Sequence, residues 1–264
     1  MMTHGGAVRT GHLMPSPRST TRTLKATPAA APPRRARGRR GFTLLEAAMA
    51  TIILGVGVLA VVEAQQSFLD RNRWSSSGAT ASYLAAEIRE MSAHFPRHDR
   101  HSGGLYFEND ADPSTLRGWG PEADETDAED LDDLDDLDGA VFGSAAVFPA
   151  GFTMSRRYAG PINAFAQVIP ETLYSGQTEM FTPPGSDEPV EVAMRGWTQI
   201  VTVDKVEPTD FTAAVADNQR VIVSGATVRA VDRYPVRVTV TILRQPDPAD
   251  PPEVMTTLAW IVTP

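Results

Sequence analysis

The feature that most constrains this chain is an apolar run over residues 42–62. Its 21 residues contain a single charged side chain, Glu46, and no proline. As a helix that rises about 1.5 Å per residue, the run is about 32 Å long, which matches the hydrocarbon core of a bilayer. It is too long and too uniformly apolar for the surface helix of a soluble domain. The sequence therefore predicts one membrane-spanning helix.

Charge divides the chain on either side of this run. Residues 1–41 carry eight arginines, one lysine and no acid, whereas the remaining 223 residues have a net charge of −18. By the positive-inside rule, the arginine-rich end stays in the cytoplasm and the acidic body lies across the membrane. Residues 1–41 hold few large apolar side chains, so we expect a disordered leader. With such an acidic body, nucleic acid is not an expected partner.

Glu46 is the anomaly of the apolar run. A carboxylate in hydrocarbon costs roughly 2.5–3.5 kcal/mol on insertion scales, so an intramembrane acid usually has a partner. Residues 42–62 contain no Lys, Arg or His that can pair with it. The partner must come from elsewhere, such as another subunit or a newly made α-amino group, unless Glu46 lies at the headgroups.

The residues around this acid, Arg39-Arg40-Gly41-Phe42-Thr43-Leu44-Leu45-Glu46-Ala47, resemble the prepilin signal of type IV pilins and type II secretion pseudopilins. The resemblance covers roughly residues 35–65. It implies that a membrane aspartyl prepilin peptidase cuts between Gly41 and Phe42 and methylates the new amino terminus on Phe42. Glu46 is then the fifth mature residue, which in this family neutralises the terminal amine of a neighbouring subunit during assembly.

The same resemblance implies a location and a set of partners. The protein is expected in the bacterial inner membrane as a single-pass subunit, with its head in the periplasm or outside the cell, incorporated in a pilus or pseudopilus. The implied partners are the prepilin peptidase, other pilin or pseudopilin subunits, the inner-membrane assembly platform and membrane lipid. The leader of 41 residues is long for the family, and a start at Met14 shortens it to 28.

Two other interpretations of this segment remain open. Arg39-Arg40 followed by Gly41-Phe42-Thr43-Leu44 also resembles a twin-arginine export signal, with Val62-Glu63-Ala64 as a small-x-small cleavage site. The mature protein is then exported and soluble. In the other interpretation, the run is an uncleaved anchor for a binding domain. The prepilin interpretation is favoured over export because Glu46 is unusual in an export signal, whose apolar stretch has about 7–15 residues.

Beyond the span, the apolar residues follow a helical spacing. One stripe of a predicted amphipathic helix over residues 63–96 is formed by Tyr83, Leu84, Ile88, Met91 and Phe95. With the span it gives a long helix from Phe42 to about Phe95, with a weak point at residues 75–78 and an end at Pro96. We expect the stripe to pack on a globular head.

Residues 97–190 are predicted to be an irregular acidic region. Within it, residues 122–138 hold eleven acids in seventeen, which favours a solvated loop. So many oxygen ligands before Gly139 can instead bind calcium, although the spacing is not that of an EF-hand. The candidate ligands are Asp132, Asp133, Asp135, Asp136 and Asp138. A similar Asp-Asp-x-Asp-Asp-x-x-Gly segment occurs in some minor pilin-like proteins, which extends the resemblance.

A second candidate metal cluster consists of His94, His98, His101 and Asp99. His94 and His98 are four residues apart, but Pro96 between them breaks the helix that would align them. A solvated loop is therefore the favoured interpretation of these histidines.

Residues 191–264 alternate between apolar and polar side chains with period two. Four strands are predicted, at 192–206, 220–231, 236–243 and 254–262, with a proline-rich loop at 245–253. A long helix followed by an antiparallel sheet is an α+β fold, as in pilin heads. The chain has no cysteine, no phosphate loop and no G-x-S-x-G elbow, so neither an enzyme nor a cofactor is predicted. The large acidic head favours a minor subunit over a major one.

Overall fold

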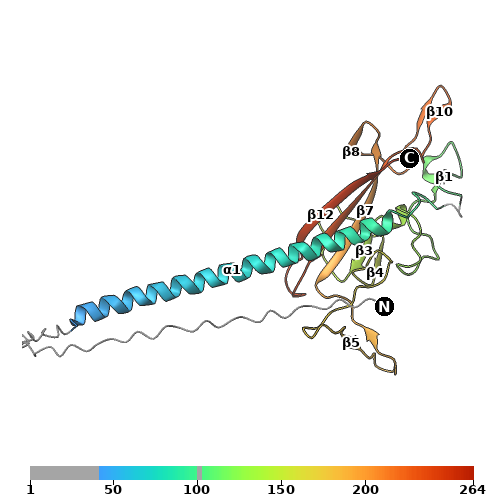
Figure 1. The fold of residues 1–264 in the computed structure, drawn as a ribbon. Coiled ribbons are helices and arrows are strands. Elements are labelled where there is room, and N and C mark those ends of the chain that lie inside the picture. The colour runs from blue at the N-terminus through green and yellow to red at the C-terminus, as the bar shows by residue number, and fades with distance from the viewer. Residues whose placement is uncertain (1–41, 100–102) are drawn as a thin grey trace, which may run out of the picture. The chain divides into compact units, whose positions relative to one another are not determined.

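A computed structural model describes residues 42–99 and 103–264 (Figure 1). The expected disordered leader and His101 lie outside the described residues. The chain divides into two compact units, Met1–Gly57 and Val58–Pro264. The division falls inside a long helix, α1 (Leu44–Ser92), which is helical on both sides of it.

Helix α1 begins with a side-chain cap. The N–H of Glu46 donates a 3.2 Å hydrogen bond to Oγ1 of Thr43, and the N–H of Ala47 donates to the Thr43 carbonyl at 3.1 Å. Thr43 is therefore the N-cap residue, and its hydroxyl satisfies one of the free N–H groups of the first turn. The helix is long and apolar enough to cross a membrane, and its most apolar window is wholly exposed.

The helix continues without a break through residues 75–78, where the sequence predicts a weak point. Two hydroxyl groups that follow these residues bond back to their carbonyls: Thr80 Oγ1 donates to Ser76 O at 3.2 Å, and Ser82 Oγ donates to Gly78 O at 2.9 Å. The helix ends at Ser92, slightly before the predicted end. Pro96 favours an end here, because a proline disfavours helical backbone in the residue that precedes it.

Five strands form the main sheet, which packs against the C-terminal part of α1 (Figure 1). In sheet order they are β12 (Glu253–Val262), β11 (Val236–Arg244), β7 (Trp197–Glu207), β3 (Ala140–Gly143) and β4 (Arg156–Tyr158). A sixth strand, β8 (Asp210–Ala214), pairs with the end of β7. Strands β3 and β4 are parallel, and the other pairs are antiparallel. The fold is therefore α+β, as predicted from the sequence.

The main core lies between α1 and one face of this sheet. Leu84, Ile88 and Met91 are buried, which confirms most of the predicted stripe, whereas Tyr83 is 51% exposed. Alternate residues of β11 are buried against the same cluster, namely Val236, Val238, Val240 and Ile242. This alternation confirms the half-buried strand predicted at 236–243, and the burial of its apolar face is the main stabilising contribution of the strand.

Gln199 connects helix α1, the main sheet and the loop that contains Ile162. Its fully buried side chain lies on β7, and its Nε2 donates to the carbonyl oxygens of Leu84 on α1 at 2.9 Å and of Ile162 at 3.0 Å. Its Oε1 accepts from the N–H of Ile162 at 2.8 Å. One amide therefore satisfies both main-chain groups of Ile162 and joins helix, sheet and loop.

Two predicted strands differ in the structure. The strand expected at 192–206 starts only at Trp197, because Gly196 has a φ of +72° and a Cβ there would lie 2.9 Å from the carbonyl oxygen of Gln245. The strand expected at 220–231 is a hairpin of β9 (Val221–Val223) and β10 (Ala226–Arg229). Ser224 and Gly225, with φ values of +53° and +81°, form its two-residue turn.

Residues 97–190 contain more regular structure than the sequence predicts. Strands β3 and β4 of this region join the main sheet. The others form small hairpins outside it, in which β1 (Tyr106–Phe107) pairs with β2 (Leu116–Arg117), and β5 (Met180–Phe181) pairs with β6 (Val190–Glu191). Arg157 fixes β4 by donating to the carbonyl oxygens of Gly143 at 2.9 Å and Ala145 at 2.7 Å.

Candidate functional site

The first candidate site is the exposed apolar part of α1. Every residue from 42 to 76 is exposed, including Phe42 at 76%, and burial along the helix begins at Ser77. Among the described residues, the Glu46 carboxylate has no ion-pair partner. Gly41, on the other side of the expected cleavage site, lies outside the described residues.

The first turn of α1 contains Glu46, whose main-chain N–H, and not its carboxylate, bonds to the cap residue Thr43. Thr43 and Glu46 have the T-x-x-E spacing of a capping box, and Glu46 is the third residue of the helix. A carboxylate in the first turn also interacts favourably with the positive end of the helix dipole. A test of Glu46 in assembly must therefore separate its charge from its position in the cap.

The second candidate site is the acidic segment, and the prediction of a solvated loop is wrong for its central residues. Glu125 is 7% exposed, and three aspartates are 1% exposed, namely Asp133, Asp135 and Asp136. Buried leucines alternate with them, at Leu131, Leu134 and Leu137. This i, i+3 spacing is the signal in the sequence that the segment belongs to the core, because burying these leucines also buries the acids between them.

Two of the buried aspartates hold the segment in its conformation. Oδ1 of Asp133 accepts from the N–H groups of Asp135 at 2.9 Å and Asp136 at 3.2 Å. Oδ2 of Asp136 accepts from the N–H groups of Asp132 at 3.1 Å and Asp133 at 3.0 Å. These bonds replace main-chain partners that the irregular backbone does not supply. Burial, together with the nearby carboxylates of Asp135 and Asp136, raises the pKa of Asp133 to about 10.

Asp135 instead belongs to a buried cluster that contains cations. Its Oδ1 lies 2.8 Å from Nδ1 of His98, and its Oδ2 accepts from the N–H of Gly120 at 3.0 Å. Burial lowers the pKa of His98 to about 4, and the positive charges of Lys205 and Arg97 contribute to this shift. The Lys205 ammonium group is itself buried, 4.9 Å from the centre of the Trp119 ring, and donates to the Asp217 carbonyl oxygen.

The candidate histidine cluster, over which the sequence favours a solvated loop, does not assemble in the described residues. His98 pairs with Asp135 from the acidic segment, and its side chain is only 7% exposed, so the prediction of a solvated loop is wrong for this histidine. His94 is exposed, with Nδ1 3.2 Å from the carbonyl oxygen of Glu90.

The five candidate aspartate ligands also do not form one site. Asp138 accepts from the N–H of Val203 at 2.9 Å, and Asp135 faces His98. The remaining three predicted ligands, Asp132, Asp133 and Asp136, each offer an oxygen atom within 4.8 Å of the others. A second group of the same kind joins Asp136 to two acids that the sequence analysis did not select, Glu122 and Glu125.

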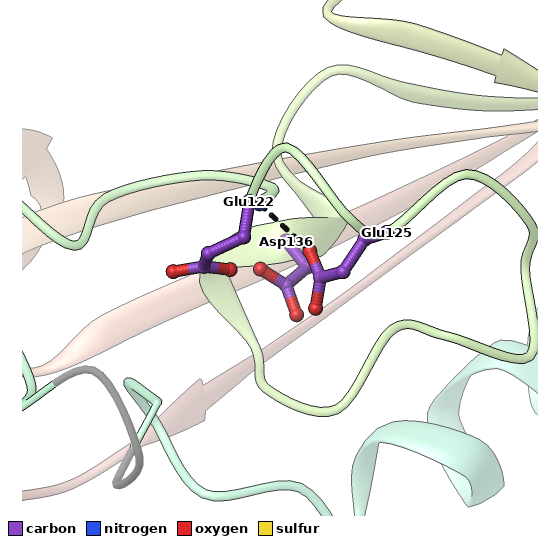
Figure 2. A group of neighbouring side chains, drawn as sticks. All are labelled: Glu122, Glu125 and Asp136. Carbon is purple, nitrogen blue, oxygen red and sulfur yellow. Dashed lines mark hydrogen bonds between the residues drawn. The ribbon is translucent and has the colours of Figure 1, made fainter.

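Figure 2 shows the second group, with the three carboxyl groups next to one another. Oε2 of Glu125 accepts from the N–H of Glu122 at 2.8 Å. Burial raises the pKa of Glu125 to about 8, and the charges of Asp136 and Glu122 add to the shift. Burial also raises the pKa of Glu122 and of Asp136, in each case with a further carboxylate adding to the effect. These side chains can supply hard oxygen ligands to a cation.

Comparison with protein-family models, with curated proteins and with solved structures finds no match to this chain. The architecture is nevertheless pilin-like, because a long N-terminal apolar helix packs through its C-terminal part against a mostly antiparallel sheet.

Proposed function

We propose that this chain is a minor pilin or pseudopilin, cut between Gly41 and Phe42 and held in the inner membrane by residues 42–62. It is then assembled into a type IV pilus or a type II secretion pseudopilus. The observation that carries the proposal is the burial pattern of α1, since residues 42–76 are exposed whereas the helix packs into the head from Ser77 onward.

An apolar helical surface of this length is unfavourable in water and requires contact with other apolar groups. Lipid tails provide this contact before assembly, and the helices of neighbouring subunits provide it within a filament. Gly55 and Gly57 are consistent with helix packing, because a Cβ at either position would meet no described atom within 4 Å beyond its own stretch of helix backbone and its two chain neighbours. Glycine is not required there by the chain's own packing, whereas small residues allow neighbouring helices to approach closely.

Processing by a prepilin peptidase separates this function from the two alternatives. The full chain is expressed in a host that lacks the enzyme, with and without an active prepilin peptidase. We expect the active enzyme to remove residues 1–41 from the wild type and to leave Gly41→Val uncut, because a branched side chain replaces the small residue at the scissile bond. Intact mass measures both results.

The control is a catalytically inactive peptidase, which should leave both chains whole. A wild-type chain that stays whole with the active enzyme indicates an uncleaved anchor. Cleavage near Gln65 without the peptidase indicates an exported soluble protein. Either result contradicts the proposed function.

A further inference from the structure

The acidic segment contains a group of carboxylates whose arrangement the fold does not explain. Glu122, Glu125 and Asp136 each place one oxygen within 4.8 Å of the others (Figure 2). Hydrogen bonds account for one oxygen of Glu125 and one of Asp136, which bind main-chain N–H groups of the same segment. Because the residues come from two stretches of the segment, their side chains converge only in the folded head.

Two buried oxygen atoms, one in this group and one on strand β4, have no hydrogen-bond partner in the part of the chain that the structure describes. One is Oδ1 of Asp136, on a residue that is 1% exposed, and the other is the hydroxyl of Tyr158, on a residue that is 5% exposed. The charges of Glu125 and Asp136 act on Tyr158, whose pKa burial raises to about 12. A buried polar atom without a partner costs about 1–3 kcal/mol, so these oxygen atoms indicate a missing ligand.

The charges around the group point to a cation as that ligand. Asp135, the neighbour of Asp136, faces His98 and acts electrostatically on Lys205 and Arg97. The charges that shift the pKa of Glu122, Glu125 and Asp136 come instead from other carboxylates. One basic side chain, Arg156 of β4, reaches this segment: its Nη2 donates to the main-chain oxygen of Glu122 at 3.4 Å, its Nη1 is buried without a partner in the described residues, and its charge acts on Tyr158.

We propose that Glu122, Glu125 and Asp136 bind a hard divalent cation of the calcium type, an inference that does not depend on the proposed role in filament assembly. The donor set is all oxygen and contains no nitrogen or sulfur, which selects calcium-like ions over zinc or copper. Calcium also accepts the irregular geometry that a loop provides, whereas magnesium requires a near-ideal octahedron.

Calorimetric titration of the full chain in detergent micelles, stripped with a chelator, tests this site with CaCl2 alone. We expect one calcium ion per chain, with a dissociation constant of the order of 10⁻⁴ M, as in extracellular calcium modules. Glu125→Gln should weaken binding by about ten-fold or more, because one of three anionic ligands is lost. The glutamine keeps the oxygen atom that accepts from the N–H of Glu122.

Glu129→Gln is the matched control, because Glu129 is an exposed acid of the same segment and belongs to neither carboxylate group. It should bind calcium as the wild type does. Thermal unfolding checks that the Glu125→Gln variant is folded. In chelator near neutral pH this variant should melt close to the temperature of the wild type, since a pKa of about 8 keeps Glu125 mostly protonated there, and it should lose the rise that calcium produces.

Three results overturn the proposal. One is the absence of calcium binding to the wild type, which leaves a proton shared between Glu125 and Asp136 as the neutralising group. Another is equal binding by wild type and Glu125→Gln. The last is binding that is lost in Asp132→Asn but retained in Glu125→Gln, which assigns the ion to the group of Asp132, Asp133 and Asp136 instead.

Discussion

Glu46→Gln is expected to leave the protein in the membrane and to remove it from filaments. In the proposed assembly, the Glu46 carboxylate neutralises the terminal amine of a neighbouring subunit in an apolar environment. Removing one partner of a buried ion pair costs about 3–5 kcal/mol, because the other charge is left uncompensated. At about 1.4 kcal/mol per ten-fold change, the fraction of protein in filaments should fall by about 100-fold or more. Quantitative immunoblots of sheared filaments and of membranes measure both parts of this prediction.

Glutamine at this position separates the charge of Glu46 from its place in the helix cap. The bond to Thr43 uses the main-chain N–H of residue 46, so both Glu46→Gln and Glu46→Ala keep it. Glutamine also keeps the polar side chain that a capping box accepts at this position, and it loses only the charge. Glu46→Ala loses both the charge and the polar group of the side chain and should assemble no better. The matched control is Glu63→Gln, an exposed acid of the same helix that lies beyond the apolar run. If Glu46→Gln assembles normally and Glu46→Ala does not, assembly needs a polar side chain in the first turn and not its charge, and the proposed pairing is wrong.

Gln199→Leu is expected to destabilise the head more than any surface substitution. Leucine has nearly the volume of glutamine, but it leaves the buried N–H and carbonyl of Ile162 without partners. With about 1–3 kcal/mol lost for each unsatisfied group, the expected cost is about 3 kcal/mol. For a protein of this size, that cost lowers the unfolding temperature by about 6–12 °C. Near-ultraviolet circular dichroism of the full chain in micelles follows the transition through the tryptophans of the head.

Gln177→Leu provides the comparison for this variant, because the Gln177 side chain is exposed and makes no hydrogen bond in the described structure. It should melt within about 1 °C of the wild type, since isolated surface substitutions change stability by about 0.5 kcal/mol or less. Equal melting of Gln199→Leu and Gln177→Leu means that Gln199 does not join α1 to the sheet in the way described.

The buried faces of the helix and of the central strand could be predicted because each shows a regular repeat of apolar residues. One side of each element packs against the core, which produces the helical stripe through Leu84, Ile88 and Met91 and the alternation over residues 236–243. The hairpin at 221–229 was missed because its strands are short and its turn consists only of Ser224 and Gly225. A Ser-Gly pair between two apolar runs is itself a turn signal, and it decides against one long strand.

The carboxylate groups were not predictable in the same way. A high density of acids on its own favours a solvent-exposed segment. The evidence for burial is the spacing of Leu131, Leu134 and Leu137 in the same segment. Even with that spacing, nothing local places Glu122 and Glu125 beside Asp136, because their proximity depends on how the whole segment packs on the sheet. For the same reason, the pairing of His98 with Asp135 could not be read from the histidine spacing.

The mature amino terminus is the most direct test of the proposed function. Protein purified from membranes of its native host is analysed by amino-terminal sequencing and intact mass. We expect a chain that begins at Phe42 and carries one additional methyl group, because cutting and methylation at this position are the combined activity of a prepilin peptidase. A chain that begins at Met1 or Met14, or near Gln65, contradicts the proposed pilin or pseudopilin function.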